Sequence, residues 1–509
     1  MSVLIIDVGT SGLRAGLVEP DGTLHAERRR RLPLEAPFPG LVEFDPGALA
    51  HAALDAAAEV LVSEGRDGNV EAVGVTNQRA STILWDAADG RSLGPGLGWQ
   101  DLRTAGDCLA LQADGLRLAP NQSATKLAHL LAQPAAREVP VERLRFGTVD
   151  SWLTWHLTGG TRHVTDLSNA AVTGLVLPDG SDWDDAVLER LAIPRSTLPT
   201  IVESAGTLGE VTALRSGGSG GSGGSGRGAG GSASRPLALT GLLGDQQASL
   251  VGQGGTRPGI AKITFGTGGM LDVFLGEDPP ATATRQPHGT FPIVVLRVGG
   301  VTSWGAEGIL LAAGSNVDWL RDDLGILTDA AQSGDLAAQV PDADGVVYVP
   351  HLLGEGTPGW DLGARGTLVG LTRGTDRRHL CRAVLEGVAD AGVDLVEAAE
   401  ADTGVALQAL RVDGGMSANP VFVAALAEAS GRAVEVSPVL EATAVGAGLV
   451  AGLGLGWYRT LEEVAAQWRP ARVVEPTWSD DRRAAQRARW QAARERAAAW
   501  YPELTALDF

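Results

Sequence analysis

The sequence predicts an α/β protein built from two related domains, and two observations carry this prediction. Segments typical of strands and of helices alternate along the chain, as they do when both pack in one layered domain. A strand, a Gly-Thr turn and a second strand occur at residues 8–13 and again, 257 residues later, at residues 265–270. This offset is about half of the 509 residues, so each domain is expected to present one such hairpin.

The elements of the N-terminal part follow one another closely. Strands are expected at Val3–Val8 and Leu13–Val18, and a third from Thr23 after the turn at residues 20–22. Asp45 and Pro46 have the pattern of a helix start, an acidic cap followed by proline at the first helical position. Further strand and turn signals follow at residues 70–76 and at Asp89-Gly90.

A run of Gly-Gly-Ser triplets at residues 216–234 interrupts this pattern. It predicts a flexible surface loop without a function of its own, natural or engineered. Gly218, Gly220 and Gly223 match the dinucleotide-binding spacing, but no strand precedes them and no helix follows, so that match is accidental. Glycine is about 14% of the chain, 69 of 509 residues, against roughly 7% in ordinary proteins. The run holds only ten of these glycines, so most of the excess needs another explanation.

The second half repeats the strand pattern. Strands are expected at Leu237–Leu243, Lys262–Phe265 and Met270–Leu275. A further strand ends at Asp413 in a glycine turn, after which Asn419 and Pro420 begin a helix. Residues 479–500 form an Arg/Ala-rich amphipathic helix whose arginines are expected to face solvent.

Charge and composition limit the partners. Asp and Glu number 61 against 41 Lys and Arg, and the net charge of -20 argues against nucleic acid as a partner. Two cysteines cannot form a disulfide framework, which indicates a reducing compartment. No basic segment precedes the apolar start, and the uncharged residues 444–458 are too few and too rich in glycine to span a bilayer. We therefore expect a soluble, cytoplasmic protein with no membrane partner.

Asp7 and the glycine turns indicate a phosphate site. Asp7 ends a strand beside backbone amides that glycine leaves uncovered, so amides and the Thr10 hydroxyl can hold phosphate oxygens while the carboxylate holds Mg²⁺. We expect Gly9, Gly266 and Gly415 to converge on ATP. A lysine-bearing P-loop is excluded, because the only lysines, Lys126 and Lys262, do not follow its glycine pattern.

Asp245 is the candidate general base. It follows Gly244 at the end of an apolar strand, where a carboxylate can accept the proton of an attacking hydroxyl. The alternative is that Asp245 caps the following helix. Arg79 and Trp99 suit a polyhydroxylated substrate, the first as donor and the second as a cover for the carbon skeleton, although each alone is more often structural.

Together these residues resemble the FGGY carbohydrate kinases, and among them the glycerol kinases most closely. The motifs that carry the resemblance cover nearly the whole chain: residues 7–10, 76–79, 99–101, 146–153, 244–248, 265–268, 366–386 and 412–415. The resemblance implies two actin-like ATPase domains of ribonuclease-H-like fold with a central ligand cleft. Residues 1–245 would form the substrate-side domain and residues 246–509 the nucleotide-side domain.

The resemblance also implies a reaction and the residues that perform it. The reaction is ATP-dependent phosphorylation of a primary hydroxyl, with glycerol to glycerol 3-phosphate as the default. Asp245 would be the base, and Asp7 and Asp245 would serve Mg²⁺. The positions that match nucleotide contacts are Thr10, Ser11, Gly12, Arg14, Gly266, Thr267, Gly314, Asp318, Gly415 and Asn419, with Asp318 in the place of the usual glutamine.

The substrate pocket departs from the family pattern. Its positions are Arg79, Ala80, Trp99, Asn121, Asp245, Gln246 and Met270. Ala80 replaces a glutamate, Asn121 a tyrosine and Met270 an aromatic residue, which enlarges the pocket and removes hydrogen-bond partners. The alternatives are therefore a kinase for a longer polyol or a ketose, or a nucleotide-binding sensor that has lost kinase activity. The Gly/Ser run also occupies the loop that binds a sugar-bisphosphate regulator in some relatives, so that control is expected to be missing. A homo-oligomer is possible.

Overall fold

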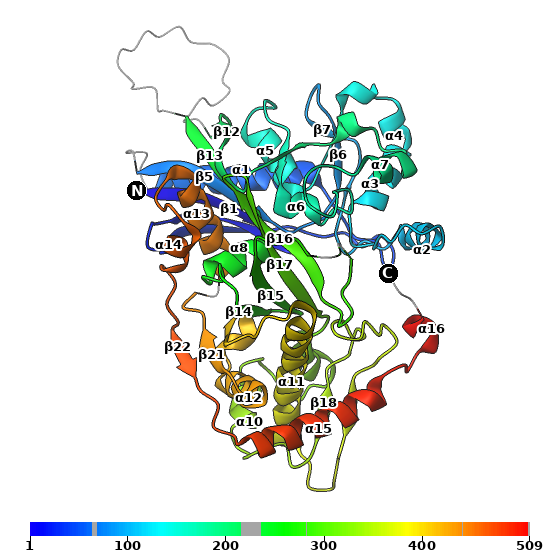
Figure 1. The fold of residues 1–509 in the computed structure, drawn as a ribbon, viewed down its shortest axis with the longest axis vertical. Coiled ribbons are helices and arrows are strands. Elements are labelled where there is room, and N and C mark those ends of the chain that lie inside the picture. Colours follow the sequence, from blue (N-terminus) through cyan, green and yellow to red (C-terminus); the bar gives the residue numbers. More distant parts are fainter. Residues whose placement is uncertain (64–68, 215–235, 281, 283, 440, 507–509) are drawn as a thin grey trace.

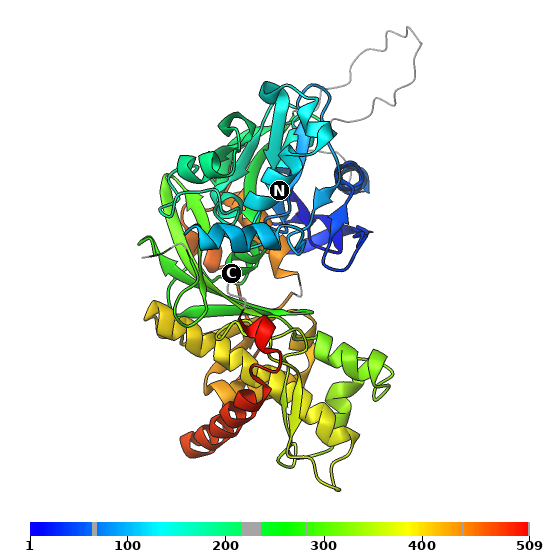
Figure 2. The same ribbon diagram turned by 90° about the vertical axis from the view of Figure 1, so that its right-hand side faces the viewer.

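The computed structural model describes residues 1–63, 69–214, 236–280, 282, 284–439 and 441–506. The Gly/Ser run at residues 216–234 and its expected loop structure lie outside these residues. Each half of the chain is organised around one large sheet, and the two halves stand one above the other (Figure 1; Figure 2). No helix among the described residues is both long and apolar enough to cross a membrane.

The N-terminal sheet has the strand order β12-β13-β5-β1-β2-β3. Its strands are β1 (Ser2–Val8), β2 (Gly12–Val18), β3 (Leu24–Arg31), β5 (Val70–Asn77), β12 (Ala205–Val211) and β13 (Leu237–Gly244). The central strand β1 is buried on both faces, as its continuous apolar run predicts. Leu4 and Ile6 face helix α1 (Pro46–Ser63), whereas Val3 and Ile5 face helix α13 (Ala442–Leu455). The end of β1 at Asp7 is therefore held from both sides.

The C-terminal sheet has the order β16-β17-β15-β14-β20-β21-β22. Its strands are β14 (Ile260–Phe265), β15 (Gly269–Gly276), β16 (Phe291–Val298), β17 (Val301–Leu310), β20 (Ala409–Asp413), β21 (Ala433–Val436) and β22 (Arg472–Val474). The series β17-β15-β14-β20-β21 repeats the series β3-β2-β1-β5-β13 strand for strand, with three antiparallel strands followed by two parallel ones. The prediction of two related domains from the repeated Gly-Thr hairpin is thus confirmed.

Small strand pairs and a set of helices complete the fold. The remaining strands are β4 (Glu43–Phe44), β6 (Ile83–Asp86), β7 (Arg91–Ser92), β8 (Gly96–Leu97), β9 (Leu144–Gly147), β10 (Val164–Asp166), β11 (Thr200–Val202), β18 (Val347–Val349) and β19 (Thr367–Val369). The remaining α-helices are α2 (Ala105–Ala113), α3 (Ala124–Leu131), α4 (Pro134–Arg137), α5 (Val149–Leu157), α6 (Leu167–Ala171), α7 (Asp185–Arg190), α8 (Asp245–Gly252), α9 (Ser315–Asp318), α10 (Gln332–Ala337), α11 (Arg377–Thr403), α12 (Pro420–Ser430), α14 (Leu461–Ala465), α15 (Asp480–Ala497) and α16 (Pro502–Thr505). Single turns lie at η1 (Val141–Arg143), η2 (Arg195–Thr197), η3 (Trp319–Asp323) and η4 (Gly415–Ala418).

Helix α13 returns from the C-terminal half of the sequence to pack on the N-terminal sheet, beside α8 (Figure 1). The two helices cross closely, because a Cβ atom on Gly446 would overlap the carbonyl of Ala248 and one on Gly252 would overlap that of Ala442. Close helix crossings such as this one account for part of the glycine excess. They also fix α8, the helix that begins with Asp245. The expected domain boundary between residues 245 and 246 stays a prediction.

The C-terminal helix α15 corrects one expectation. Its arginines do not all face solvent: Arg487 is only 17% exposed and forms ion pairs with Asp390 and Asp394 of α11. Arg494, 20% exposed, pairs with the buried Glu355. The buried Trp490 donates its indole N–H to Asp394 at 2.8 Å. Arginines of α15, the helix that runs across the base of the molecule in Figure 1, therefore bind α11 and its neighbours.

Candidate active site

Two acidic residues, Asp7 and Asp245, lie at the carboxyl ends of β1 and β13, the two strands that flank β5 in the N-terminal sheet. Asp7 is the last but one residue of β1, is 6% exposed, and has the Arg14 guanidinium 3.1 Å from its Oδ2. Burial raises the pKa of Asp7 to about 7, against the opposing charge of Arg14 and with a further rise from the Asp245 carboxylate. Asp7 and Asp245 are thus close enough to interact electrostatically, as two carboxylates at one metal or phosphate site would be.

Asp245 is positioned by the strand end before it. The cap residue of α8 is Gly244, and Asp245 is the first helical residue, so the alternative that Asp245 caps this helix is wrong. The Gly244 N–H donates to Ser168 Oγ at 2.9 Å, and Ser168 in turn donates to the fully buried Asp166 at 3.0 Å. Burial raises the pKa of Asp245, although the positive charge of Arg79 acts in the opposite direction.

Arg79 and Gln246 link this acidic centre to the C-terminal sheet. Arg79 Nε lies 3.5 Å from Asp245 Oδ1, and its Nη2 donates to Glu307 on β17 at 2.5 Å. Gln246 Oε1 accepts a hydrogen bond of 3.0 Å from Lys262 on β14. Lys262 also forms an ion pair of 2.6 Å with Asp272 on β15, and both side chains are fully buried. Arg79 and Gln246, which are predicted to hold the acceptor, therefore contact strands of the C-terminal sheet.

Trp99 is held beside the first Gly-Thr turn. Its indole Nε1 donates to Thr10 Oγ1 at 3.2 Å. The fully buried Lys126 donates from Nζ to the carbonyls of Gly98 at 2.9 Å and Trp99 at 3.2 Å, and burial lowers the pKa of Lys126 to about 7. The predicted cluster at residues 99–101 also contains Asp101, which is fully buried and ties the loop to Arg103 and to the Val42 N–H. Asp101 is therefore structural.

In the C-terminal half, the two predicted glycine turns near Gly266 and Gly415 contact each other, and the segment around Gly314 contacts the first of them. The Gly314 N–H donates to the Gly266 carbonyl at 2.8 Å, and the Ala313 N–H to the Thr267 carbonyl at 2.8 Å. Gly414, with φ of +84°, packs on the backbone of Phe265, which only a residue without a side chain allows. The turns at residues 266–268, 313–315 and 414–415 thus form one surface.

The three glycines expected at ATP, Gly9, Gly266 and Gly415, have open space where a side chain would lie. A Cβ atom on Gly415 would meet no described atom within 4 Å, one on Gly266 would meet only a carbonyl at 3.9 Å, and one on Gly9 only a carbonyl at 3.5 Å. Packing therefore does not explain these three glycines, whereas Gly12 is needed for the approach of the Arg30 carbonyl at 2.7 Å. Open space beside glycine amides suits a phosphate group, so the residues present fit a nucleotide.

The other predicted site residues have varied surroundings. Asn419 caps α12 through hydrogen bonds from the Val421 and Phe422 N–H groups. Asp318 pairs with Arg321 at 3.0 Å. Arg14 also pairs with Glu441, so it faces carboxylates on two sides. Ser11 and Asn121 are exposed, Met270 is half-buried on β15, and Ala80 is buried with a φ of +61°. The described contacts join neither Asn121 nor Met270 to Asp245.

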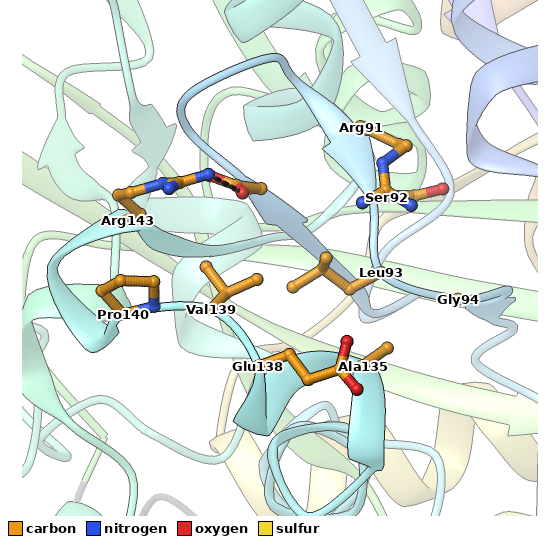
Figure 3. A pocket seen from close by; sticks show the side chains of 10 residues that line it. Arg91, Ser92, Leu93, Gly94, Ala135, Glu138, Val139, Pro140 and Arg143 are labelled. Carbon is orange, nitrogen blue, oxygen red and sulfur yellow. Dashed lines mark hydrogen bonds and ion pairs between the residues drawn. The ribbon is translucent and has the colours of Figure 1, made fainter.

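A cavity of about 570 Å³ lies elsewhere, between the β6–β7 hairpin and residues 135–143 (Figure 3). Its wall contains the ion pair between Arg143 and Asp86, with Leu93 and Val139 opposite each other in the figure. It is lined by none of the predicted site residues. The chemistry predicted from the sequence therefore does not use this cavity.

Three residues at the site escaped prediction: Glu307, Lys262 and Lys126. A signal for two of them was present, because the chain has only two lysines and the structure buries both completely. A charged side chain is rarely buried without a specific partner. Two lysines in a sequence whose other cationic residues are arginines could therefore have been predicted to have specific structural roles. Glu307 carries no such signal, since only the fold brings β17 next to Arg79.

Comparison with known proteins assigns the family. The N-terminal domain of the FGGY family of carbohydrate kinases matches residues 2–224, and its C-terminal domain matches residues 261–455. A glycerol kinase of Aromatoleum aromaticum is 41% identical over 98% of this chain and 99% of its own. The structure of Plasmodium falciparum glycerol kinase with ADP superposes with a TM-score of 0.87 at 25% identity, over 97% of this chain and 98% of the other. A xylulose kinase from Rhodospirillum rubrum gives 0.81 at 26% identity, over 99% of this chain and 100% of the other. The chain belongs to the FGGY family of carbohydrate kinases.

Proposed function

We propose that this kinase transfers a phosphoryl group from ATP to a primary hydroxyl of glycerol, forming glycerol 3-phosphate. One observation carries the proposal: Asp245 is a half-buried carboxylate at the start of α8, 3.5 Å from the guanidinium of Arg79, and its charge acts on the pKa of Asp7. This arrangement supports a site with an acceptor for a proton, a donor for hydroxyl groups and a second carboxylate. The glycerol kinase relatives support glycerol as the acceptor.

Asp245 would act as the general base. Its raised pKa favours acceptance of a proton at neutral pH, because burial makes the free carboxylate less stable than it is in water. Arg79 would hold a hydroxyl of the acceptor, and Trp99 would cover its carbon atoms. Gln246, which receives a hydrogen bond from Lys262 through its oxygen, has its amide N–H₂ left to donate to the acceptor.

When bound, ATP supplies the phosphoryl group and Mg²⁺ offsets the negative charge of its phosphates. Asp7 and Asp245 would hold the metal. Among the described residues, no group of three or more His, Cys, Asp or Glu side chains is arranged to bind a metal by itself. Mg²⁺ usually takes one or two carboxylates together with phosphate oxygens and water, so this arrangement suits it. The glycine amides at Gly9, Gly266 and Gly415, with Thr10 and Thr267, would hold the phosphates.

The remaining nucleotide positions are proposed with the same roles. They are Ser11, Gly12, Arg14, Gly314, Asp318 and Asn419. For Gly314 the supporting observation is its hydrogen bond to Gly266, which joins it to a turn that is proposed to hold the phosphates. For Asp318 and Asn419 the polar groups already have partners in the protein, so nucleotide contact would be added to these interactions.

A second candidate acceptor follows from the pocket. Ala80, Asn121 and Met270 together present no carboxylate and no aromatic ring where the family pattern has both. A longer polyol or a ketose would occupy the additional space. Glycerol loses a hydrogen-bond partner in such a pocket, so discrimination against larger acceptors is expected to be weak.

An acceptor panel tests both candidates. ADP release is measured with glycerol, tetritols, pentitols and ketoses, each over a range of concentrations. The highest kcat/KM with glycerol supports the proposal, and the highest value with a larger acceptor supports the second candidate. Slow ADP release that no acceptor stimulates would refute both and favour a nucleotide-binding sensor.

A cytoplasmic location and a homo-oligomeric state are part of the same proposal. The small number of cysteines supports a reducing compartment. Light scattering on the purified protein, with and without ATP and glycerol, measures the oligomeric state. A monomer under all conditions would refute the oligomer.

A further inference from the structure

The guanidinium group of Arg79 has three nitrogen atoms with three different environments. Nε faces Asp245 at 3.5 Å, and Nη2 donates to Glu307 at 2.5 Å. Nη1 is buried and has no hydrogen-bond partner among the described residues. The Arg79 side chain is only 11% exposed, so Nη1 has little access to water either. A buried donor without a partner costs about 1–3 kcal/mol, so its presence requires an explanation.

Glu307 binds Nη2 of Arg79, and Nη1 is the nitrogen that remains without a hydrogen-bond partner among the described residues. Its side chain is 8% exposed and lies on β17, opposite Asp272 of β15 in the register of the C-terminal sheet. Both strands belong to the sheet that carries the Gly266 hairpin, whereas Arg79 follows β5 of the other sheet. The Arg79–Glu307 pair therefore joins the acceptor side to the nucleotide side. Arg79 pairs with one carboxylate of each half, so without Glu307 its ion pair with Asp245 would be the only one left to hold the guanidinium among the described residues.

We propose that Glu307 is a positioning residue that fixes the Arg79 guanidinium beside Asp245 and leaves Nη1 for a hydroxyl of the acceptor. This inference rests on the proposed function, because it assigns Arg79 to the acceptor of the kinase. It explains the unpaired nitrogen: the acceptor hydroxyl supplies the missing oxygen when it binds.

The charges around Glu307 agree with a fixed position. The surrounding charges are those of Arg79, Lys262, Asp245, Asp272 and Glu307, two cations and three carboxylates, of which Lys262, Asp272 and Glu307 are buried. Burial raises the pKa of Glu307, and the nearby Asp272 raises it further, although the charge of Arg79 opposes both. Lys262 is already engaged with Asp272 and Gln246, so Arg79 is the cation that Glu307 contacts.

The test compares two variants of buried Glu–Arg pairs. Glu307→Gln keeps the size of the side chain and removes its charge. Glu355→Gln does the same at a pair of matching burial, Glu355 with Arg494, which lies at α15 and contacts no predicted site residue. Steady-state kinetics of the full chain are measured for the best acceptor of the panel and for ATP, and thermal melting reports folding.

Glu307→Gln is expected to raise the acceptor KM or lower acceptor kcat/KM by about a hundredfold, because a displaced binding group disturbs the geometry of transfer. The KM for ATP is expected to stay near that of the wild type. Glu355→Gln is expected to keep both kinetic constants. Glu307→Asp is expected to recover part of the acceptor affinity, since it restores the charge on a shorter side chain.

A double-mutant cycle completes the test. If Glu307 acts through Arg79, Glu307→Gln has no further effect on the acceptor KM in an Arg79→Gln background. Equal losses for acceptor and ATP, additive effects in the cycle, or equal effects of Glu307→Gln and Glu355→Gln would each overturn the inference. A wild-type protein that phosphorylates no acceptor would instead refute the proposed function, so the two failures are distinguishable.

Discussion

The indole Nε1 of Trp99 donates a hydrogen bond of 3.2 Å to the hydroxyl of Thr10. Trp99 is the proposed cover of the acceptor and Thr10 a proposed phosphate ligand. One hydrogen bond thus connects the two substrate sites within the N-terminal half. Lys126 fixes the backbone at Trp99, because its Nζ donates hydrogen bonds to the Gly98 and Trp99 carbonyls.

Trp99→Phe is expected to weaken both substrates. Phenylalanine keeps an apolar ring over the acceptor but cannot donate to Thr10, and one lost hydrogen bond of about 1 kcal/mol corresponds to about a fivefold effect. We expect KM to rise for acceptor and for ATP, measured with each as the varied substrate. Thr10→Ser, which keeps the hydroxyl, is the control. An increase confined to the acceptor would show that the bond does not connect the sites.

Asp245→Asn is expected to reduce kcat by at least about a hundredfold, since an amide cannot take the proton of the acceptor hydroxyl. ATP affinity, measured by calorimetry, is expected to remain close to the wild-type value. Asp185→Asn, on the exposed start of α7, is a control that leaves turnover unchanged. Near-normal turnover by Asp245→Asn would exclude Asp245 as the base.

Gly415→Ala tests the nucleotide surface. Its new Cβ meets no described atom, and Gly106 in α2 has the same open surroundings far along the sequence. Neither substitution is expected to destabilise the fold, and Gly106→Ala should stabilise it by roughly 0.5–1 kcal/mol because glycine disfavours helix. Only Gly415→Ala is expected to raise the KM for ATP. Equal KM values for the two variants would remove Gly415 from the ATP site.

Ala80→Glu is expected to narrow the choice of acceptor. A carboxylate at this position adds a hydrogen-bond partner for a small polyol and fills space that a larger acceptor would use. The ratio of kcat/KM for glycerol to that for a pentitol should rise by about tenfold or more. Ala80→Gln separates the effect of charge from that of size. An unchanged ratio for Ala80→Glu would place the residue outside the acceptor pocket.

Lys126 makes stability depend on pH. Burial lowers its folded-state pKa from 10.5 to about 7, so between these values the unfolded chain binds more protons than the folded one. Stability therefore rises with pH in this window, by up to about 1.4 kcal/mol per pH unit, and this contribution is lost as pH falls towards 7. Lys126→Met has no titrating group at this position and should lack this pH dependence. When the free energy of unfolding in urea is measured at pH 7, 8 and 9, that of the wild type should rise relative to that of Lys126→Met. An equal pH dependence of the two free energies would contradict the assignment.

Local sequence patterns predicted the position of several strands and helices, and they gave a hypothesis for the turns that bind phosphate. The strands at residues 2–8, 12–18 and 237–244 and the helix that begins at Pro46 agree with their local patterns, because apolar runs and caps act over a few residues. The repeated Gly-Thr hairpin predicted the duplicated topology. The boundary at residue 245 and the roles of the site residues remain predictions.

Which side chains lie together could be seen only in the tertiary structure. Glu307 reaches Arg79 across 228 positions of sequence, and α13 returns from the C-terminal half to the first sheet. It also showed that arginines of α15 bind α11 instead of facing solvent. Such contacts depend on which faces the packed elements bring together, and no local pattern encodes a partner hundreds of residues away. Part of the glycine excess has the same origin, since Gly446 and Gly252 are required by the crossing of two helices that are far apart in the sequence.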